Sequence, residues 1–423
     1  MSLQAEREQL LIWIDKERDE LVNFLASFVR SASPNPPGDT RNAAATLIEW
    51  LAKAGLPART IAPRPEMPNI VASLQGSRPG RHLVLNGHID HFPCNDADRW
   101  ARDPWGGQIA DGRIYGRGVS DMKNGTVALL FTFGWLAKLK DRLPGRLTFT
   151  AVSDEETGGT WGAKYLLDHH PEVLGDCLLN AEPGAPTTIR FGEKGILRAA
   201  VIIETSGCHG AYTHKSSSAT RLAARIALEL AAVDDLAVTM DAAVERALDE
   251  AADEIDRIHV EGAARLIKRF TLNIGVVRGG VKVNMLPGTC RLECDVRVPV
   301  GESVERALSA MRVIVARHSE ARLEVMGFTE PNWSDPSHPM VGHLRDACVR
   351  VSGVRPFAIT SLGASDARLW RMKGVPAFTY GTTATNVAMP DEHTDVEEWI
   401  GVVKTLTLAA HAYLHGEGAA CRT

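Results

Sequence analysis

Three consecutive acidic residues at the end of a predicted buried strand constrain this chain more than any other stretch. Residues 147–152 are apolar and rich in residues that favour β-structure, and Asp154, Glu155 and Glu156 follow them before a pair of glycines. Open α/β sheets place their ligand sites at such strand ends. Carboxylates packed this closely repel one another unless a cation or a shared proton relieves the repulsion. Taken alone, the stretch is more typical of a solvated acidic turn than of a metal site.

Length and composition indicate a globular protein of more than one domain. A chain of 423 residues is too long for one ordinary core, and 44% hydrophobic and 23% charged residues are typical of globular proteins. The formal net charge of −5 gives no sign of a nucleic-acid partner or an acidic membrane partner. No apolar run predicts a membrane span, and the N-terminus lacks the apolar core of a signal peptide. Seven scattered cysteines predict reduced thiols, so we expect a cytoplasmic protein.

Strands that alternate with helices predict an α/β fold with a mostly parallel sheet covered by helices. This pattern covers residues 1–196 and returns over residues 329–423. Over residues 197–328 the order changes to β-α-β-β-α-β, which predicts an inserted α+β domain. In the first part, apolar spacing predicts one helix over residues 4–30 and another that begins near Asp121.

Further candidate residues lie at or just beyond other predicted strand ends. His88 and Asp90 follow the predicted strand 82–86 on one side of an extended chain, where a carboxylate can fix the tautomer of a histidine ligand. Asp121 lies in a glycine-rich loop before a helix, and Glu182 follows another predicted strand. Each residue alone is more simply explained as a loop histidine, a helix N-cap or a turn glutamate. Together, one nitrogen and several oxygens suit Zn, Mn or Co.

The order of these motifs resembles that of a family of co-catalytic metallohydrolases that includes acetylornithine deacetylase, succinyl-diaminopimelate desuccinylase, glutamate carboxypeptidase and aminoacylase. The resemblance covers nearly the whole chain. It is carried by Gly-His-Ile-Asp (87–90), Gly-Arg-Gly-Val-Ser-Asp-Met-Lys-Asn-Gly (116–125), Asp-Glu-Glu (154–156), Asn-Ala-Glu (180–182), Gly-Cys-His (207–209), Gly-Gly-Val-Lys-Val-Asn-Met-Leu-Pro (279–287) and Asp-Val-Arg (295–297). It implies a catalytic domain in two parts, 1–196 and 329–423, and an inserted domain that serves as a lid and in dimerisation.

The resemblance also implies roles for the matching residues of the catalytic domain. The implied metal ligands are His88, Asp121, Glu182 and Glu156. His88 and Glu182 would hold one metal, Asp121 would bridge two metals, and Glu156 would bind the second. Asp90 would orient His88, and Glu155 would act as the general base.

Four residues of the inserted domain receive roles that concern the substrate. His209 would reach the active site of a partner subunit and stabilise the developing oxyanion. Asn284 and Arg297 would grip a substrate carboxylate, for which an arginine is well suited. His214, close to these motifs, is a further candidate for substrate binding, although taken alone it is more simply explained as a charged surface residue.

One segment departs from the family's pattern. Family members carry a last metal-binding histidine shortly before an Asp-Glu pair, but alignment on Asp391 and Glu392 puts Ala388 at this position. Alanine offers no ligand atom, so either His393 takes over or the second metal is bound weakly or not at all. The expected cofactor is therefore one or two divalent transition-metal ions, Zn, Mn or Co.

We therefore expect a metal-dependent hydrolase that cleaves a carbon–nitrogen bond of a small substrate with a carboxylate, such as an N-acyl amino acid, by metal-activated water with Glu155 as base. A rarer family member releases ammonia from 5-nitroanthranilate, and the altered second site keeps this deaminase alternative open. A remote alternative is a non-catalytic scaffold or binding protein. The expected partners are the substrate and other copies of the chain, in a homodimer or higher homo-oligomer, with no nucleic acid and no membrane.

Overall fold

The computed structural model describes residues 2–416, and the chain divides into two compact units. The first unit comprises the residues up to Phe191, Ser334–Ile359 and the residues from Ser365 on. The second comprises Gly192–Trp333 together with Thr360–Ala364. The sequence prediction places the inserted domain at residues 197–328 and does not include the short segment 360–364.

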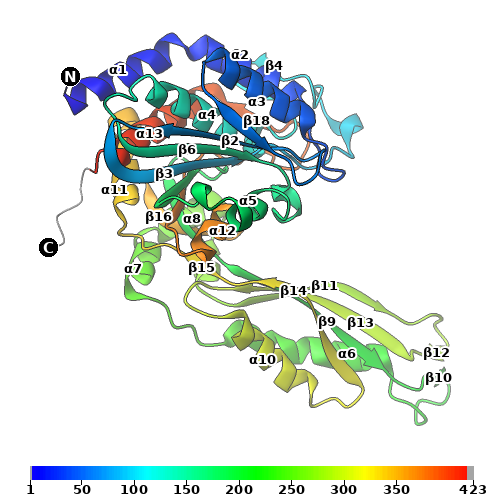
Figure 1. The fold of residues 1–423 in the computed structure, drawn as a ribbon. Helices are drawn as coiled ribbons and strands as arrows, with labels where there is room; N and C mark the ends of the chain where they lie inside the picture. Colours follow the sequence, from blue (N-terminus) through cyan, green and yellow to red (C-terminus); the bar gives the residue numbers. More distant parts are fainter. Residues whose placement is uncertain (1, 417–423) are drawn as a thin grey trace. The chain divides into compact units, whose positions relative to one another are not determined.

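A sheet of nine strands lies mainly in the first unit (Figure 1). Its path runs β1 (Ala58–Ile61), β2 (Asn69–Gln75), β6 (Pro144–Val152), β3 (Arg78–His88), β7 (Cys177–Asn180), β17 (Ala377–Thr379), β8 (Thr188–Glu193) and β15 (Asn332–Trp333), and β16 (Phe357–Ser361) pairs with β8. Only β15 and the ends of β8 and β16 belong to the second unit. The four central strands, β6, β3, β7 and β17, are parallel. The strands β1, β2, β8 and β15 pair antiparallel. The predicted α/β fold with a mostly parallel sheet is confirmed.

Helices cover both faces of this sheet (Figure 1). One face carries α4 (Asn124–Ala137) and α13 (Val396–Leu414), with α1 (Leu3–Lys16), α2 (Arg18–Arg30), α3 (Arg41–Lys53) and α11 (Pro339–Ser352) around them. Nearly every residue of α4 is buried, which explains why this helix is apolar on all sides. The other face carries α5 (Ala163–His169) and α12 (Ala367–Met372), where Leu166 and Trp370 pack in one cluster with Val84 of β3.

The single helix predicted over residues 4–30 is wrong, because the chain leaves helical geometry at Glu17. The backbone of Glu17 has φ −95° and ψ 11°, and it separates α1 from α2. Its carboxylate accepts hydrogen bonds from Nε1 of Trp135 and Nζ of Lys138, both at 2.7 Å. Both donors belong to α4 and its C-terminal end. Tertiary contacts therefore hold the break in a helix that the spacing of apolar residues alone would continue.

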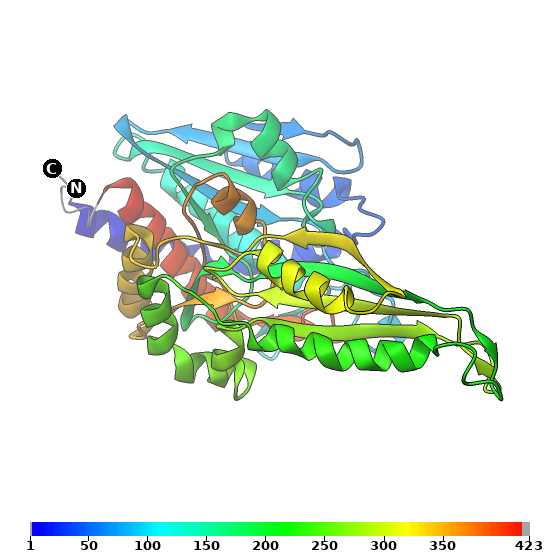
Figure 2. The same ribbon diagram turned by 90° about the horizontal axis from the view of Figure 1, so that it is seen from below.

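The second unit contains an antiparallel sheet in the order β11 (Thr271–Gly279), β13 (Thr289–Val298), β9 (Gly195–Glu204) and β14 (Ala321–Thr329). Helices α6 (Ala219–Leu230) and α10 (Val304–Val315) lie side by side on one of its faces (Figure 2). Alternate residues of β13, including Cys290 and Cys294, belong to the apolar core that these helices cover. The short helices α7 (Ala242–Glu250), α8 (Ala252–His259) and α9 (Ala263–Ile267) and the strand pair β10 (Cys208–His209) and β12 (Met285–Leu286) complete the unit.

A small third sheet consists of β4 (Gln108–Ala110), β5 (Arg113–Tyr115) and β18 (His393–Asp395). The strand β18 leads directly into α13, so this sheet determines where His393 lies. Within residues 2–416, no helix combines the length and the apolar character that a membrane crossing requires.

Candidate metal centre

His88, Asp121 and Glu182 converge at the carboxyl-terminal edge of the central strands. His88 is the last residue of β3, and Glu182 follows β7, its parallel neighbour. Nε2 of His88 lies 3.1 Å from Oδ1 of Asp121 and 3.4 Å from Oε1 of Glu182. One ligand atom from each residue lies within 4.8 Å of the others. The three residues are far apart in the sequence. His88 and Glu182 meet because parallel neighbouring strands end at one edge of a sheet.

Asp121 reaches this cluster from an irregular segment ahead of α4. Its backbone is extended, with φ −119° and ψ 99°, and α4 begins only at Asn124. Asp121 therefore does not cap the helix. Glu392 holds the segment in place, because its carboxylate accepts hydrogen bonds from the N–H groups of Ser120 and Asp121 at 3.0 and 3.3 Å and pairs with buried Arg117 at 2.9 Å. Burial raises the pKa of Glu392 to about 7.

Asp90 contacts the ring nitrogen of His88 that faces away from the cluster. Nδ1 of His88 lies 2.9 Å from the backbone oxygen of Asp90 and 3.5 Å from its carboxylate. The same carboxylate accepts hydrogen bonds from Nδ2 of Asn35 and from the N–H groups of Glu155 and Glu156. Burial alone would raise the pKa of Asp90, but the contacts with His88 and Asn35 outweigh it and hold the pKa below its usual value. Asp90 thus ties the histidine to the acidic turn and leaves Nε2 for the cluster.

The acidic turn is buried, so a solvated turn is the wrong explanation for this stretch. Asp154 is buried, and the side chain of Glu155 is only 12% exposed. Nη1 of Arg368 in α12 donates a hydrogen bond to Oε1 of Glu155 at 3.2 Å. Burial and the nearby carboxylates of Asp366 and Glu182 hold the pKa of Glu155 well above its usual range, although Arg368 acts in the opposite direction.

Hydrogen bonds do not compensate the negative charge of the carboxylates at this edge, so the group favours a bound cation. Oε1 of Glu156 is buried and has no hydrogen-bond partner among the described residues. Burial and the charge of Asp121 raise the pKa of Glu156 to about 10 and also raise the pKa of Glu182. A divalent ion held by His88, Asp121 and Glu182 would relieve this repulsion, and one imidazole with carboxylates is a donor set that Zn, Mn and Co accept. The residues present therefore fit a metal.

His393 lies away from this group, so its predicted role as a replacement ligand gains no support from the geometry. In β18 it pairs with Tyr115 of β5, and the two rings are 5.1 Å apart. Its Nδ1 lies 2.8 Å from the backbone oxygen of Asp391. Ala388 lies in the preceding turn with φ 59°. Over residues 2–416, the metal-ligating groups that converge at this edge number three, His88, Asp121 and Glu182.

The predicted substrate-binding residues of the second unit lie at two ends of its sheet. His209 of β10 and Asn284 beside β12 are neighbours, because the N–H of Gly210 donates to the backbone oxygen of Asn284 at 2.8 Å. His214 lies near them, and its ring meets that of Tyr212 edge-on. Arg297 lies near the far end of β13, where it pairs with Asp295 at 2.6 Å and donates to the backbone oxygen of Leu362. A single unit therefore does not bring His209 and Arg297 together.

Sequence reasoning misses four polar residues that surround the candidate centre: Asn35, Asp366, Arg368 and Glu392. Asp366 is buried, neither of its carboxylate oxygens has a hydrogen-bond partner among the described residues, and burial raises its pKa to about 7. Asp366 and Arg368 lie at the start of the short helix α12, whose other residues are apolar except Arg371, and these charged residues were the available signal. Asn35 lies in a proline-rich stretch, from which the sequence predicts only the end of a helix and no functional residue.

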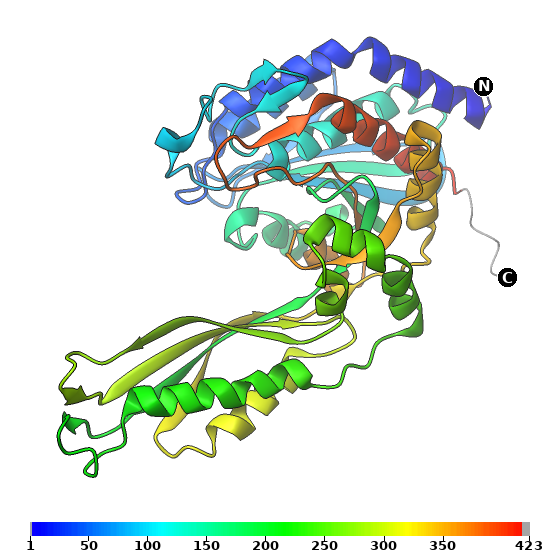
Figure 3. The ribbon, with the colours of Figure 1, turned by 180° about the vertical axis from the view of Figure 1, so that it is seen from behind.

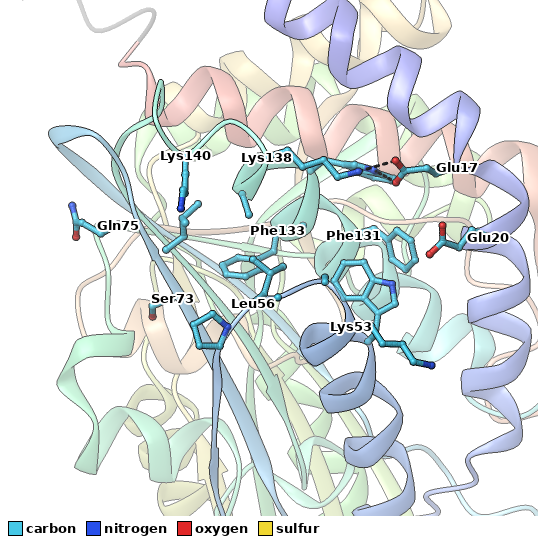
Figure 4. Close-up of a pocket in the computed structure, with 18 residues that line it drawn as sticks. Glu17, Glu20, Lys53, Leu56, Ser73, Gln75, Phe131, Phe133, Lys138 and Lys140 are labelled. Atoms are coloured by element: carbon cyan, nitrogen blue, oxygen red, sulfur yellow. Dashed lines mark hydrogen bonds and ion pairs between the residues drawn. The ribbon is translucent and has the colours of Figure 1, made fainter.

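A cavity of about 760 Å³ lies elsewhere in the first unit and includes none of these residues (Figure 4). Its lining comes from α2, α3, α4 and β2, with Phe131 and Phe133 inside and Lys53, Lys138 and Lys140 around them. Lys138 is paired with Glu17 at 2.7 Å. Cavity size therefore does not locate the chemistry, whereas the convergence of ligand atoms does.

Comparison with known proteins gives a consistent result. The sequence model described as peptidase family M20/M25/M40 matches residues 84–412. A succinyl-diaminopimelate desuccinylase from Sulfurovum sp. (strain NBC37-1) is 29% identical over 331 residues, which are 75% of this chain and 80% of the relative.

Two solved structures show the same fold. An M20 family metallo-carboxypeptidase from Sulfolobus solfataricus has a TM-score of 0.78 at 17% identity, and the match covers 94% of this chain and 99% of that chain. A dinuclear metal-binding peptidase of the M20 family from Bacillus subtilis has a TM-score of 0.63 at 15% identity, with 95% and 99% covered. At these identities the likeness concerns the fold alone.

Proposed function

Since this chain belongs to peptidase family M20/M25/M40 and is a metal-dependent hydrolase of carbon–nitrogen bonds, we propose that it cleaves an amide bond in a small substrate with a free carboxylate, such as an N-acyl amino acid. The observation that carries this proposal is the buried convergence of His88, Asp121 and Glu182 next to the turn that bears Glu155. The desuccinylase relative supports it, because its name describes removal of an acyl group.

In this proposal His88, Asp121 and Glu182 hold one divalent ion, and Glu156 with Asp121 contributes to a second, weaker site. A bound ion would lower the pKa of water toward neutrality and polarise the carbonyl that is attacked. Asp90 keeps the His88 ring in the orientation that directs Nε2 to the ion. Glu392 holds Asp121 in position, because its carboxylate accepts hydrogen bonds from the backbone N–H groups of Ser120 and Asp121.

Glu155 is the proposed general base and later the general acid. Its carboxylate takes a proton from the attacking water and gives that proton to the leaving nitrogen, so the amine departs without a negative charge. Burial raises the pKa of Glu155, which makes its carboxylate a stronger base toward the attacking water. Arg368 holds the carboxylate in place through its hydrogen bond to Oε1.

Residues of the second unit would bind the rest of the substrate. We assign the substrate carboxylate to Asn284, Arg297 and His214, and the developing oxyanion to His209. Since His209 and Arg297 lie at opposite ends of the sheet in one unit, the proposal places them in the sites of different subunits of a homodimer.

A second candidate function is release of ammonia from 5-nitroanthranilate. The observation in its favour is the altered second metal site, with Ala388 at the usual ligand position and His393 directed to Tyr115. Attack on a ring carbon made electron-poor by a nitro group has less need of a second ion to polarise a carbonyl. The same base, Glu155, would serve this reaction.

A substrate panel with the metal-loaded protein tests both functions. Protein loaded with Zn, Mn or Co is incubated with N-acyl amino acids, dipeptides and 5-nitroanthranilate, and released primary amine and ammonia are measured separately. We expect amine release from an N-acyl amino acid, and a loss of about 100-fold or more in Glu155→Gln with metal content unchanged. Glu49→Gln, which removes an exposed glutamate paired with Lys53, serves as the control. Full turnover by Glu155→Gln, or ammonia as the only product, would contradict the first proposal.

A further inference from the structure

A second group of metal-ligating side chains lies between the first and last helices of the chain. Glu6 of α1 and His411 of α13 are buried, and His415 follows the end of α13 with its side chain 4% exposed. Figure 3 shows α1 and α13 next to each other. We propose that Glu6, His411 and His415 form a second divalent-metal site, which binds Zn²⁺ or a similar ion and clamps α1 to α13.

The three side chains already have the geometry of a binding group. Nε2 of His411 lies 3.0 Å from Oε2 of Glu6, and Nε2 of His415 lies 3.7 Å from the same oxygen. One ligand atom from each lies within 4.8 Å of the others. The two histidines are four residues apart, which places them on one face of a helix, and their rings are 4.4 Å apart. Two imidazoles and one carboxylate suit Zn²⁺, with a fourth position for solvent.

Hydrogen bonds alone leave this cluster incomplete. Arg142 pairs with Oε1 of Glu6 at 3.4 Å, so Oε2 is the oxygen directed to the histidines. Nδ1 of His411 is buried and has no hydrogen-bond partner within residues 2–416. An unsatisfied buried polar atom calls for a water or an ion nearby.

This cluster lies at the opposite end of the sheet from His88. Nη1 of Arg81, near the start of β3, donates a hydrogen bond to the backbone oxygen of Tyr413. In the sequence, Tyr413 lies between His411 and His415. His88 is the last residue of β3, seven residues after Arg81, or roughly 23 Å at the usual rise of a strand. The two groups therefore cannot share an ion, and the second can be tested without the first.

Metal binding by a protein without the first cluster provides the test. His88→Ala with Asp121→Asn removes two members of that cluster and gives the background for all measurements. After chelation and dialysis, Zn²⁺ content is measured by mass spectrometry, and Co²⁺ is titrated by its visible absorption, which is strong for a tetrahedral site with nitrogen ligands. We expect one equivalent in the background protein, together with an increase in its thermal midpoint on addition of Zn²⁺.

Two further variants separate the proposed site from surface binding. His415→Ala, at the end of the helix, and Glu6→Gln, which keeps size and hydrogen bonding, should each weaken binding at least tenfold and abolish the thermal shift. His318→Ala is the matched control, because His318 pairs with Glu229 at 3.1 Å but belongs to no group of three converging ligands among residues 2–416. A background protein that binds no Zn²⁺, or variants that bind it as tightly as the background, would overturn the proposal.

Discussion

Replacing Arg368 by methionine tests how the charge beside Glu155 sets the working pH of the enzyme. Nη1 of Arg368 lies 3.2 Å from Oε1 of Glu155, and the two side chains are only 10% and 12% exposed, so solvent screens the pair weakly. At an effective dielectric constant of about 20, unit charges at this distance attract by about 5 kcal/mol. Part of that attraction is offset by the cost of removing both groups from water, and shifts caused by one opposite charge are usually about 1–3 pKa units.

The sign of the effect follows from which form of Glu155 the arginine favours. A positive charge favours the carboxylate and lowers its pKa, against burial and the carboxylates of Asp366 and Glu182, which raise it. Without Arg368 the pKa of Glu155 rises further, so a smaller fraction is available as base at a given pH. We expect the acid limb of the kcat/KM profile to move up by about 1–3 pH units, with a loss of about 10- to 1000-fold on that limb and a smaller loss at alkaline pH.

The assay is kcat/KM as a function of pH with the best substrate of the panel, supported by circular dichroism and metal content. Arg368→Lys retains a positive charge and should shift the limb by less than Arg368→Met. Lys373→Met, on the same helix region, breaks an exposed pair with Asp168 at 2.8 Å and should shift nothing. An acid limb at the wild-type pH in a folded, metal-loaded Arg368→Met protein would refute the argument.

Three further predictions concern stability. Gly125→Ala should cost about 1–3 kcal/mol of stability and weaken metal binding, because its Cβ would lie 2.2 Å from the backbone oxygen of Ala181, next to Glu182. Gly342→Ala in α11, where a Cβ would meet no atom within 4 Å, should instead stabilise the protein by about 1 kcal/mol. Urea unfolding combined with metal titration checks both. Burial lowers the pKa of His91 to about 3, and its Nε2 accepts from the N–H of Ser33 at 2.9 Å. Since the unfolded histidine has a pKa of about 6.5, the unfolded state binds more protons between these values, and the free energy of unfolding falls as pH decreases through this window. His91→Asn should flatten that dependence in urea titrations at several pH values, and an unchanged slope would show that other groups cause it.

Local pattern was sufficient for the fold class and for most of the candidate residues. The alternation of apolar strands and helices predicted the parallel centre of the sheet, because strands buried on both faces read as short apolar runs. His88 and Glu182 were found in the same way, since a polar residue directly after such a run must lie at the sheet's carboxyl edge. Asp121 was found from its place in a glycine-rich loop before a helix. The β-α-β-β-α-β order of the inserted unit also follows from local pattern, although its extra segment at 360–364 does not.

Contacts between distant segments decided the rest. Whether the acidic turn was solvated or buried depended on Asn35, Arg368 and the turn's own packing, none of which a window of sequence contains. Glu17 ends a helix because of Trp135 and Lys138, and His393 lies against Tyr115 because of a strand pair. The amino-acid sequence by itself determined which side chains carry ligand atoms and at which strand ends they lie. Only the tertiary structure decided which of them converge, because the distance between two side chains depends on the path of the whole chain between them.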